Sequence, residues 1–222
     1  DIRGGGDGDF NDVNIEVTWS TNLPVLTTQD AETIDTVAGN ATTAVSDSVS
    51  AGFAGMFAST PNFGADGAGS VQTSYAVRML GIGLAGFTSQ GQDVQLLELD
   101  GAVFGRITVD GQERDIFSIT VDGDGVVTLT QFAELDHVGE AEDENAFNNS
   151  ANMLRLPNEV VYLERTDTIT DRDGDQASSS LSIDIGAAMR FEDDVPRIEV
   201  AADTLLLDED ALQGANADAQ PP

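Results

Sequence analysis

Negative charge is the feature that most constrains how this chain can fold. Its 222 residues include 40 aspartates and glutamates but only nine basic residues, all arginine, so the formal net charge is −31 at pH 7. A compact state of such a chain repels itself unless cations neutralise part of the charge. Binding to nucleic acid requires clustered lysine or arginine. We therefore expect bound cations, no nucleic-acid partner and, because like charges repel, a monomeric module.

The sequence excludes disulfide bonds and several kinds of metal site. There is no cysteine, so neither a disulfide framework nor a thiolate zinc site is available. His137 is the only histidine, and a lone imidazole cannot build the multi-histidine sites that transition metals favour, so we interpret it as a surface or loop-packing residue. No segment approaches the ~20 apolar residues that span a bilayer, and we expect no membrane insertion.

Short runs in which apolar and polar residues alternate predict an all-β fold. Alternation with a period of two is the signature of a strand. Strands at this spacing, bounded by Gly, Asp, Asn or Pro, predict a sandwich-like domain with few or no helices. At most, residues 131–135 form a single helical turn, and residues 27–59 mix short edge strands with loops. The expected strands are 13–19, 71–80, 94–99, 115–121, 126–130, 160–169, 181–185 and 197–200.

The two ends of the chain differ in composition from the middle. Residues 1–12 form a glycine-aspartate loop, which we interpret as the end of a preceding or inserted module. Residues 201–222 are interpreted as a linker or the start of the next repeat. The compact β domain is then expected over residues 13–200, within a longer protein.

Three loops have the residue pattern of a calcium site. Calcium takes six to eight oxygen ligands, and a loop supplies them when Asp or Asn recurs at alternate positions while glycine allows tight curvature. None of the loops is an EF-hand, because the required glycine at position six and glutamate at position twelve are missing. The candidate ligands are Asp171, Asp173 and Asp175; Asp7, Asp9, Asn11 and Asp12; and Asp122 and Asp124.

Each candidate has a simpler alternative. Asp-Gly is also the commonest hairpin dipeptide, and for residues 122–125 a plain turn is favoured over calcium. Three adjacent carboxylates repel one another and a turn needs only one, so residues 171–175 favour calcium. Asp193 and Asp194, which with Glu192 precede Pro196, are candidate inter-domain calcium ligands, with a solvated linker as the alternative. The acidic run at residues 208–210 has the same two interpretations.

Signals for catalysis are weak, and we expect no enzyme. A Ser-His-Asp site would have to use His137, yet no Gly-x-Ser-x-Gly elbow exists. Residues 81–86 (GIGLAG) match the bare dinucleotide-binding spacing without a following helix to support it. A pair of carboxylates, as glycoside hydrolases use, does not indicate an active site in a chain with 40 acidic residues.

Four stretches occur in a recognisable order: 63–71 (FGADGAGSV); 116–119 (IFSI) with 125–131 (GVVTLTQ) and 135–137 (LDH); 170–177 (TDRDGDQA); and 191–196 (FEDDVP). Together they resemble the tandem repeat domain of type I-secreted giant RTX (repeats-in-toxin) adhesins of Gram-negative bacteria. Val195 stands where that family usually has glycine before the final proline, and residues 6–13 (GDGDFNDV) resemble a loop that ends other calcium-associated modules.

The resemblance implies export through a type I channel, an extracellular place on the cell surface, and a role in adhesion or biofilm formation. Under the first hypothesis the chain is an extender whose Ca²⁺ ions fold and stiffen it, with neighbouring domains of the same adhesin as partners. Under the second it binds a sugar or peptide through an incompletely coordinated calcium. Exposed aromatic residues beside an acidic loop would favour the second hypothesis.

Overall fold

The computed structural model describes residues 14–20, 22–30, 33, 46–81, 83–137 and 148–194, and in this part of the chain it is all-β. Within the described residues, fourteen strands form four sheets, and 3-10 conformation occurs at Ala54–Met56, at Gly186–Ala188 and at Asp30. The predicted fold class is therefore confirmed. In the described part no helix is both long and apolar enough to cross a membrane.

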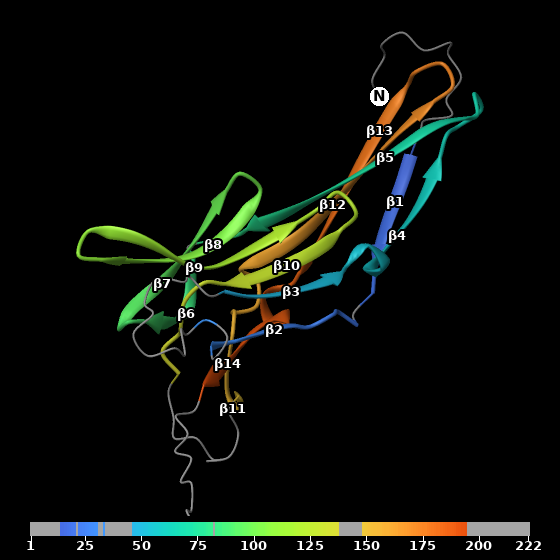
Figure 1. Ribbon diagram of the computed structural model, residues 1–222. Helices are drawn as coiled ribbons and strands as arrows, with labels where there is room; N and C mark the ends of the chain where they lie inside the picture. The colour runs from blue at the N-terminus through green and yellow to red at the C-terminus, as the bar shows by residue number, and fades with distance from the viewer. Residues whose placement is uncertain are drawn as a thin grey trace, which may run out of the picture.

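The wide body of the molecule is a curled six-stranded sheet packed against a smaller one (Figure 1). The smaller sheet has the order β11 (Asn148–Arg155), β14 (Met189–Asp194), β2 (Leu26–Gln29), and its β14–β2 pair is parallel. The large sheet is antiparallel, in the order β3 (Asp47–Gly52), β10 (Val126–Gln131), β9 (Gln112–Val121), β8 (Ala102–Val109), β7 (Gln92–Leu99), β6 (Leu84–Ser89).

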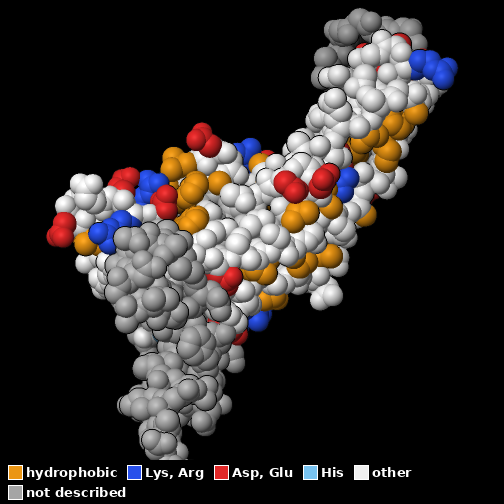
Figure 2. Space-filling view, in the orientation of Figure 1, with side chains coloured by type: hydrophobic (Ala, Val, Ile, Leu, Met, Phe, Trp, Pro, Cys, Tyr) orange, Lys and Arg blue, Asp and Glu red, His pale blue; other side chains and the backbone are white. Residues whose placement is uncertain are grey.

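A narrow arm projects from this body (Figures 1 and 2). It consists of a three-stranded antiparallel sheet with β12 in the centre and a two-stranded sheet beside it. The three-stranded sheet has the order β13 (Gln176–Asp184), β12 (Val161–Asp171), β5 (Ala68–Met79), and the two-stranded sheet pairs β1 (Asn14–Trp19) with β4 (Phe57–Asn62).

Three tight turns explain the hairpins of the large sheet. Each turn has two central residues with positive φ, the type I′ geometry that matches the twist of antiparallel strands. Glycine takes the second position each time, where a left-handed backbone costs it nothing. The turns are Gln90-Gly91, Asp100-Gly101 and Asp110-Gly111, and they join β6, β7, β8 and β9 in series.

The core lies between the six-stranded sheet and the layer made by β2, β14 and the body end of β12. Three phenylalanine rings join the layers: Phe87 on β6, Phe117 on β9 and Phe191 on β14, with centroids 4.9–6.3 Å apart. All three face inward and are buried. Each ring contributes about 1.5–3 kcal/mol of hydrophobic stabilisation when fully buried, and the aromatic contacts add to it.

The arm has little apolar interior and relies on polar contacts. Ile15 and Ile169 are buried there but lie outside the main core cluster. Asp167 is fully buried, and Arg165 contacts both of its carboxylate oxygens at 3.0 and 3.1 Å. The Arg165 guanidinium also lies 6.0 Å from the ring centroids of Phe57 and Tyr75, which brings together the two sheets of the arm.

Most predicted strands are present, and the errors have physical reasons. Residues 197–200 and both predicted domain boundaries lie outside the described residues. The expected helical turn at 131–135 is wrong: Gln131 ends β10, and the Phe132 N–H continues the pairing by donating to the Ile116 carbonyl at 2.7 Å. Strands β6, β8, β11 and β14 were not predicted. In β6 and β8 glycines interrupt the alternation, as Gly105 does in β8. Residues 27–59 do include short edge strands, β2 and β3.

Gly105→Ala is expected to lower the free energy of unfolding by about 1–3 kcal/mol, the usual cost of overpacking a core. A Cβ at this position meets the Phe117 ring on the neighbouring strand. Urea denaturation measures the effect. Gly52→Ala is the matched control, because Gly52 is also a strand residue but has open space around its Cβ position. Equal stability of the two variants would contradict the packing argument.

Asp167→Asn is expected to lower the free energy of unfolding by about 3–5 kcal/mol, because it leaves Arg165 in a mostly buried place without a charged partner. The exposed pair between Arg106 and Asp115 provides the control. Asp115→Asn removes the same charge from a solvated pair and is expected to cost less than about 1 kcal/mol. Chemical denaturation of both variants checks the difference.

Candidate metal centre

The tip of the arm brings together two loops that are far apart in the sequence (Figure 1). One is the hairpin loop between β12 and β13, and the other precedes β5. The Arg172 N–H donates to the Gly67 carbonyl at 3.2 Å, and Asp171 pairs with Ala68 across the strands. The loops are therefore held side by side by the backbone.

Three carboxylates converge at this tip. Asp66, Asp171 and Asp173 each have a carboxylate oxygen within 4.8 Å of the others. Asp171 is buried, with 5% of its surface exposed, and Asp173 is exposed. The sequence predicted Asp171 and Asp173 as ligands and missed Asp66. The signal in the sequence that could identify Asp66 is the Asp-Gly step at residues 66–67, within a stretch that resembles the adhesin repeat.

The hairpin backbone orients Asp171. Its Oδ1 accepts the N–H groups of Gly174 at 2.9 Å and Asp175 at 2.8 Å. The Asp171 N–H in turn donates to the Asp175 carbonyl at 3.0 Å, and Gly174 has a φ of 104°, where a glycine is required. One carboxylate oxygen is thus fixed by the turn.

The two neighbouring carboxylates shift each other's pKa in opposite directions. A side-chain hydrogen bond from Asp173, together with the backbone N–H donors, lowers the pKa of Asp171. The same hydrogen bond, with burial and the negative charges of Asp171, Asp175 and Asp66, raises the pKa of Asp173. Without a cation, therefore, the pair favours holding a proton between its two carboxylates.

The donor set suits a hard cation. It contains only carboxylate oxygens, whereas transition metals such as zinc prefer nitrogen or sulfur ligands. Calcium tolerates irregular geometry and completes its coordination with backbone carbonyls or water. These three residues fit part of a calcium site at the surface of the arm tip.

The other predicted calcium ligands do not form a comparable group among the described residues. Asp175 is not among the three converging residues of the tip. Asp122 supports a hairpin turn, because its Oδ1 accepts the N–H groups of Asp124 at 3.0 Å and Val126 at 2.9 Å. Within the described ranges no third acidic or histidine ligand joins Asp122 and Asp124. Asp7, Asp9, Asn11 and Asp12 lie outside the described residues.

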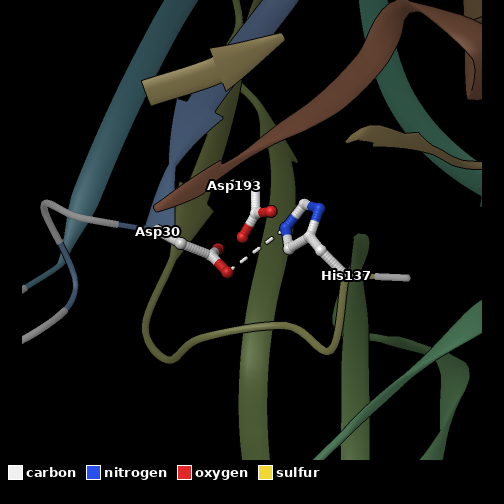
Figure 3. A group of neighbouring side chains, drawn as sticks. All are labelled: Asp30, His137 and Asp193. Atoms are coloured by element: carbon white, nitrogen blue, oxygen red, sulfur yellow. Dashed lines mark ion pairs between the residues drawn. The ribbon is translucent and has the colours of Figure 1, made fainter. Parts of the chain in front are cut away.

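The structure places Asp193 in a second group. Asp193 on β14 converges with Asp30 and His137, and we call these three residues the buried cluster (Figure 3). The His137 side chain, expected at the surface or packed in a loop, is only 2% exposed. Neither Asp30 nor His137 was predicted as a ligand. Asp194 pairs with Asn148 through the backbone, and its side chain lies outside the described part.

The three residues of the segment 135–137 have different structural roles. Leu135 packs in the core. Asp136 accepts the Thr88 hydroxyl and the Gly91 N–H, both at 2.7 Å, and the Gln90 N–H at 3.0 Å, and so holds the β6–β7 turn. Burial acts to raise the pKa of Asp136, but these hydrogen bonds outweigh it and the net shift is downward. His137 joins the buried cluster.

Exposed aromatic residues do not lie beside the acidic tip in the described part. Trp19, which is 49% exposed, pairs with Phe57 at one end of the β1–β4 sheet. The acidic loop follows Asn62 at the opposite end of that sheet. Tyr75 packs against Phe57 with ring centroids 6.2 Å apart. Phe63, which is partly exposed, is an aromatic residue of the tip loop and lies three residues before Asp66. The more exposed aromatic side chains, Trp19 and Phe132, lie away from the tip.

Comparison with known proteins gives a family but no function. Residues 26–186 match the model of a family described as Domain of unknown function (DUF5801), and the chain belongs to this family. The matched range covers more than half of the chain and includes both candidate loops of the arm tip. No curated protein and no solved structure matches the chain.

Asp173→Asn is expected to raise the melting temperature at pH 7 in excess chelator, because it removes repulsion between two ionised neighbours. The raised pKa of Asp173 means that its contribution to metal-free stability is lost as pH rises through that pKa. The advantage of the variant over the wild type should therefore shrink as pH falls toward the ordinary carboxyl range of about 4. Thermal melts across pH measure it; a difference that does not change with pH would contradict the shared proton.

Proposed function

We propose that this chain is a calcium-dependent structural module of a secreted bacterial surface adhesin, where it extends the adhesin and supports cell adhesion and biofilm formation. The module is extracellular and non-enzymatic, and its partners are the neighbouring domains of the same protein. Calcium is scarce in the cytosol and abundant outside, so the ion acts as a fold switch after secretion.

The convergence of Asp66, Asp171 and Asp173 is the observation that carries this proposal. A calcium ion held by these carboxylates cross-links the loop before β5 to the β12–β13 hairpin, at the end of the arm farthest from the hydrophobic core. An arm with few buried apolar residues has little other means of stiffening its tip. Calcium there supplies stiffness where hydrophobic packing is thin.

Two further features support the adhesin role. The net charge of −31 destabilises the compact state by self-repulsion, and bound divalent cations reduce this repulsion. The four stretches that resemble the RTX adhesin repeat include residues 63–71 and 170–177, which are the two loops of the arm tip. The segments that carry the resemblance are thus also the segments that bring the three carboxylates together.

Calcium is expected to raise the melting temperature of the wild-type protein by about 5–10 °C per site when the free ion reaches roughly 100 times its Kd. Extracellular calcium modules have Kd values of roughly 10⁻⁴–10⁻³ M, so tens of millimolar calcium is the relevant range. Differential scanning calorimetry in calcium and in excess chelator measures the shift.

Matched variants distinguish calcium binding at the arm tip from non-specific screening of the net charge by calcium. The double variant Asp66→Asn with Asp173→Asn should lose the part of the calcium-induced shift that comes from the tip. Asp124→Asn, which removes a carboxylate from an ordinary Asp-Gly turn, should keep the full shift. The proposal fails if the wild-type melt is the same in calcium and in chelator, or if the double variant responds to calcium as strongly as the wild type.

A further inference from the structure

The buried cluster places two aspartates opposite each other on neighbouring strands. On β2 the inward-facing residues are Leu26 and Thr28, and Asp30 follows at the next inward position. On β14 they are Met189 and Phe191, followed by Asp193. The parallel register pairs Met189 with Leu26 and Phe191 with Thr28. If the same register continues for two more residues on each strand, Asp193 lies beside Asp30.

This arrangement is costly for the fold unless something holds the two carboxylates together. Like charges opposite each other on neighbouring strands are destabilising, and Asp30 is only 1% exposed. His137, from the segment after β10, points between them (Figure 3), with its Nε2 3.2 Å from Asp30 Oδ2. His137 and Asp193 are partly buried. A divalent cation bound between the three side chains lowers the repulsion between the two carboxylates, with the imidazole in its neutral form.

Neighbouring groups orient the Asp30 carboxylate. The Leu135 N–H donates to Asp30 Oδ2 at 3.0 Å, and the side-chain amide of Gln131 donates to Asp30 Oδ1. Hydrogen bonds of this kind, from donors behind a ligating carboxylate, fix its direction and are typical of metal sites. Oδ2 therefore accepts the Leu135 N–H and also faces the His137 ring.

Gln131 supplies an independent sign of a missing ligand. Its side chain is fully buried at the end of β10, and its Nε2 is used by Asp30 Oδ1 and by the Ala133 carbonyl at 3.1 Å. Both acceptors require nitrogen at that position, so the amide cannot be reversed. Among the described residues Gln131 Oε1 then has no hydrogen-bond donor. A buried acceptor of this kind beside the cluster calls for a donor such as ion-bound water.

We propose that Asp30, His137 and Asp193 bind one divalent transition-metal ion of the zinc class. Their ligand atoms lie within 4.8 Å of one another, and the set of one imidazole and two carboxylates suits zinc better than calcium. The ion joins β2, β14 and the segment after β10 and acts as a structural staple in a chain that has no cysteine. This site is separate from the arm tip and does not depend on calcium binding there.

Calorimetric titration of the full chain with zinc chloride tests the site. The protein is made without a polyhistidine tag, stripped with chelator, dialysed, and titrated in saturating calcium so that carboxylate sites for hard cations are filled. We expect one zinc ion per chain. His137→Gln and Asp193→Asn should each weaken zinc binding by at least roughly 100-fold, because loss of even an outer-shell partner costs about 10–100-fold in metal affinity.

Asp124→Asn serves as the matched control, because it removes a carboxylate from an ordinary Asp-Gly turn and should leave zinc affinity unchanged. Failure of calcium binding at the tip together with intact zinc binding would overturn the proposed function alone. No zinc site in saturating calcium, or a site that His137→Gln leaves intact, overturns the present inference alone.

X-ray absorption of the zinc-loaded wild type keeps the test decisive if either variant fails to fold. The chain has a single histidine and no cysteine, so an imidazole in the zinc coordination shell can come only from His137 of a tag-free protein. We expect one imidazole with the remaining ligands oxygen. A shell of oxygen atoms alone overturns the site.

Discussion

Compensation of buried aspartates is the constraint on which the rest of the structure depends. In a chain this acidic, Asp30, Asp167 and Asp171 are nevertheless withdrawn from water, and each would destabilise the fold without a partner. Asp167 is compensated by the Arg165 guanidinium and Asp171 by the N–H groups of its own turn. Asp30 receives an amide, a backbone N–H and an imidazole. These partners of Asp30 lie far from it in the sequence, whereas Arg165 and the turn N–H groups are local to Asp167 and Asp171.

The central strand of the arm explains why polar compensation matters most there. Val161 and Leu163, at the start of β12, belong to the hydrophobic core, whereas Asp167 and Asp171, near its end, lie in the arm. One continuous strand therefore passes from a region stabilised by apolar burial to one stabilised by ion pairs, hydrogen bonds and, as proposed, calcium. A ligand at the tip acts on the part of the molecule that packing stabilises least.

The two proposed ions have different chemistry because their surroundings differ. The arm tip offers only carboxylates, of which Asp66 is partly exposed and Asp173 is exposed, and such a donor set suits a weakly bound and exchangeable hard cation. The buried cluster adds an imidazole and lies against the core, with a carboxylate fixed from behind by Gln131. A site of that kind favours a tightly held structural ion. One site responds to the medium and the other holds strands together.

The sequence by itself determined the fold class, the positions of most strands and the acidity that calls for cations, because alternation and net charge are local or summed properties. It also predicted that Asp171 and Asp173 lie close together, because carboxylates at alternate positions of one tight turn are neighbours in any fold. Only the tertiary structure decided that Asp66 joins them, that Asp122 serves a turn, and that Asp193 meets Asp30 and His137. Those meetings depend on strand register and on the parallel pairing of β2 with β14, which bring together residues that no spacing in the sequence relates.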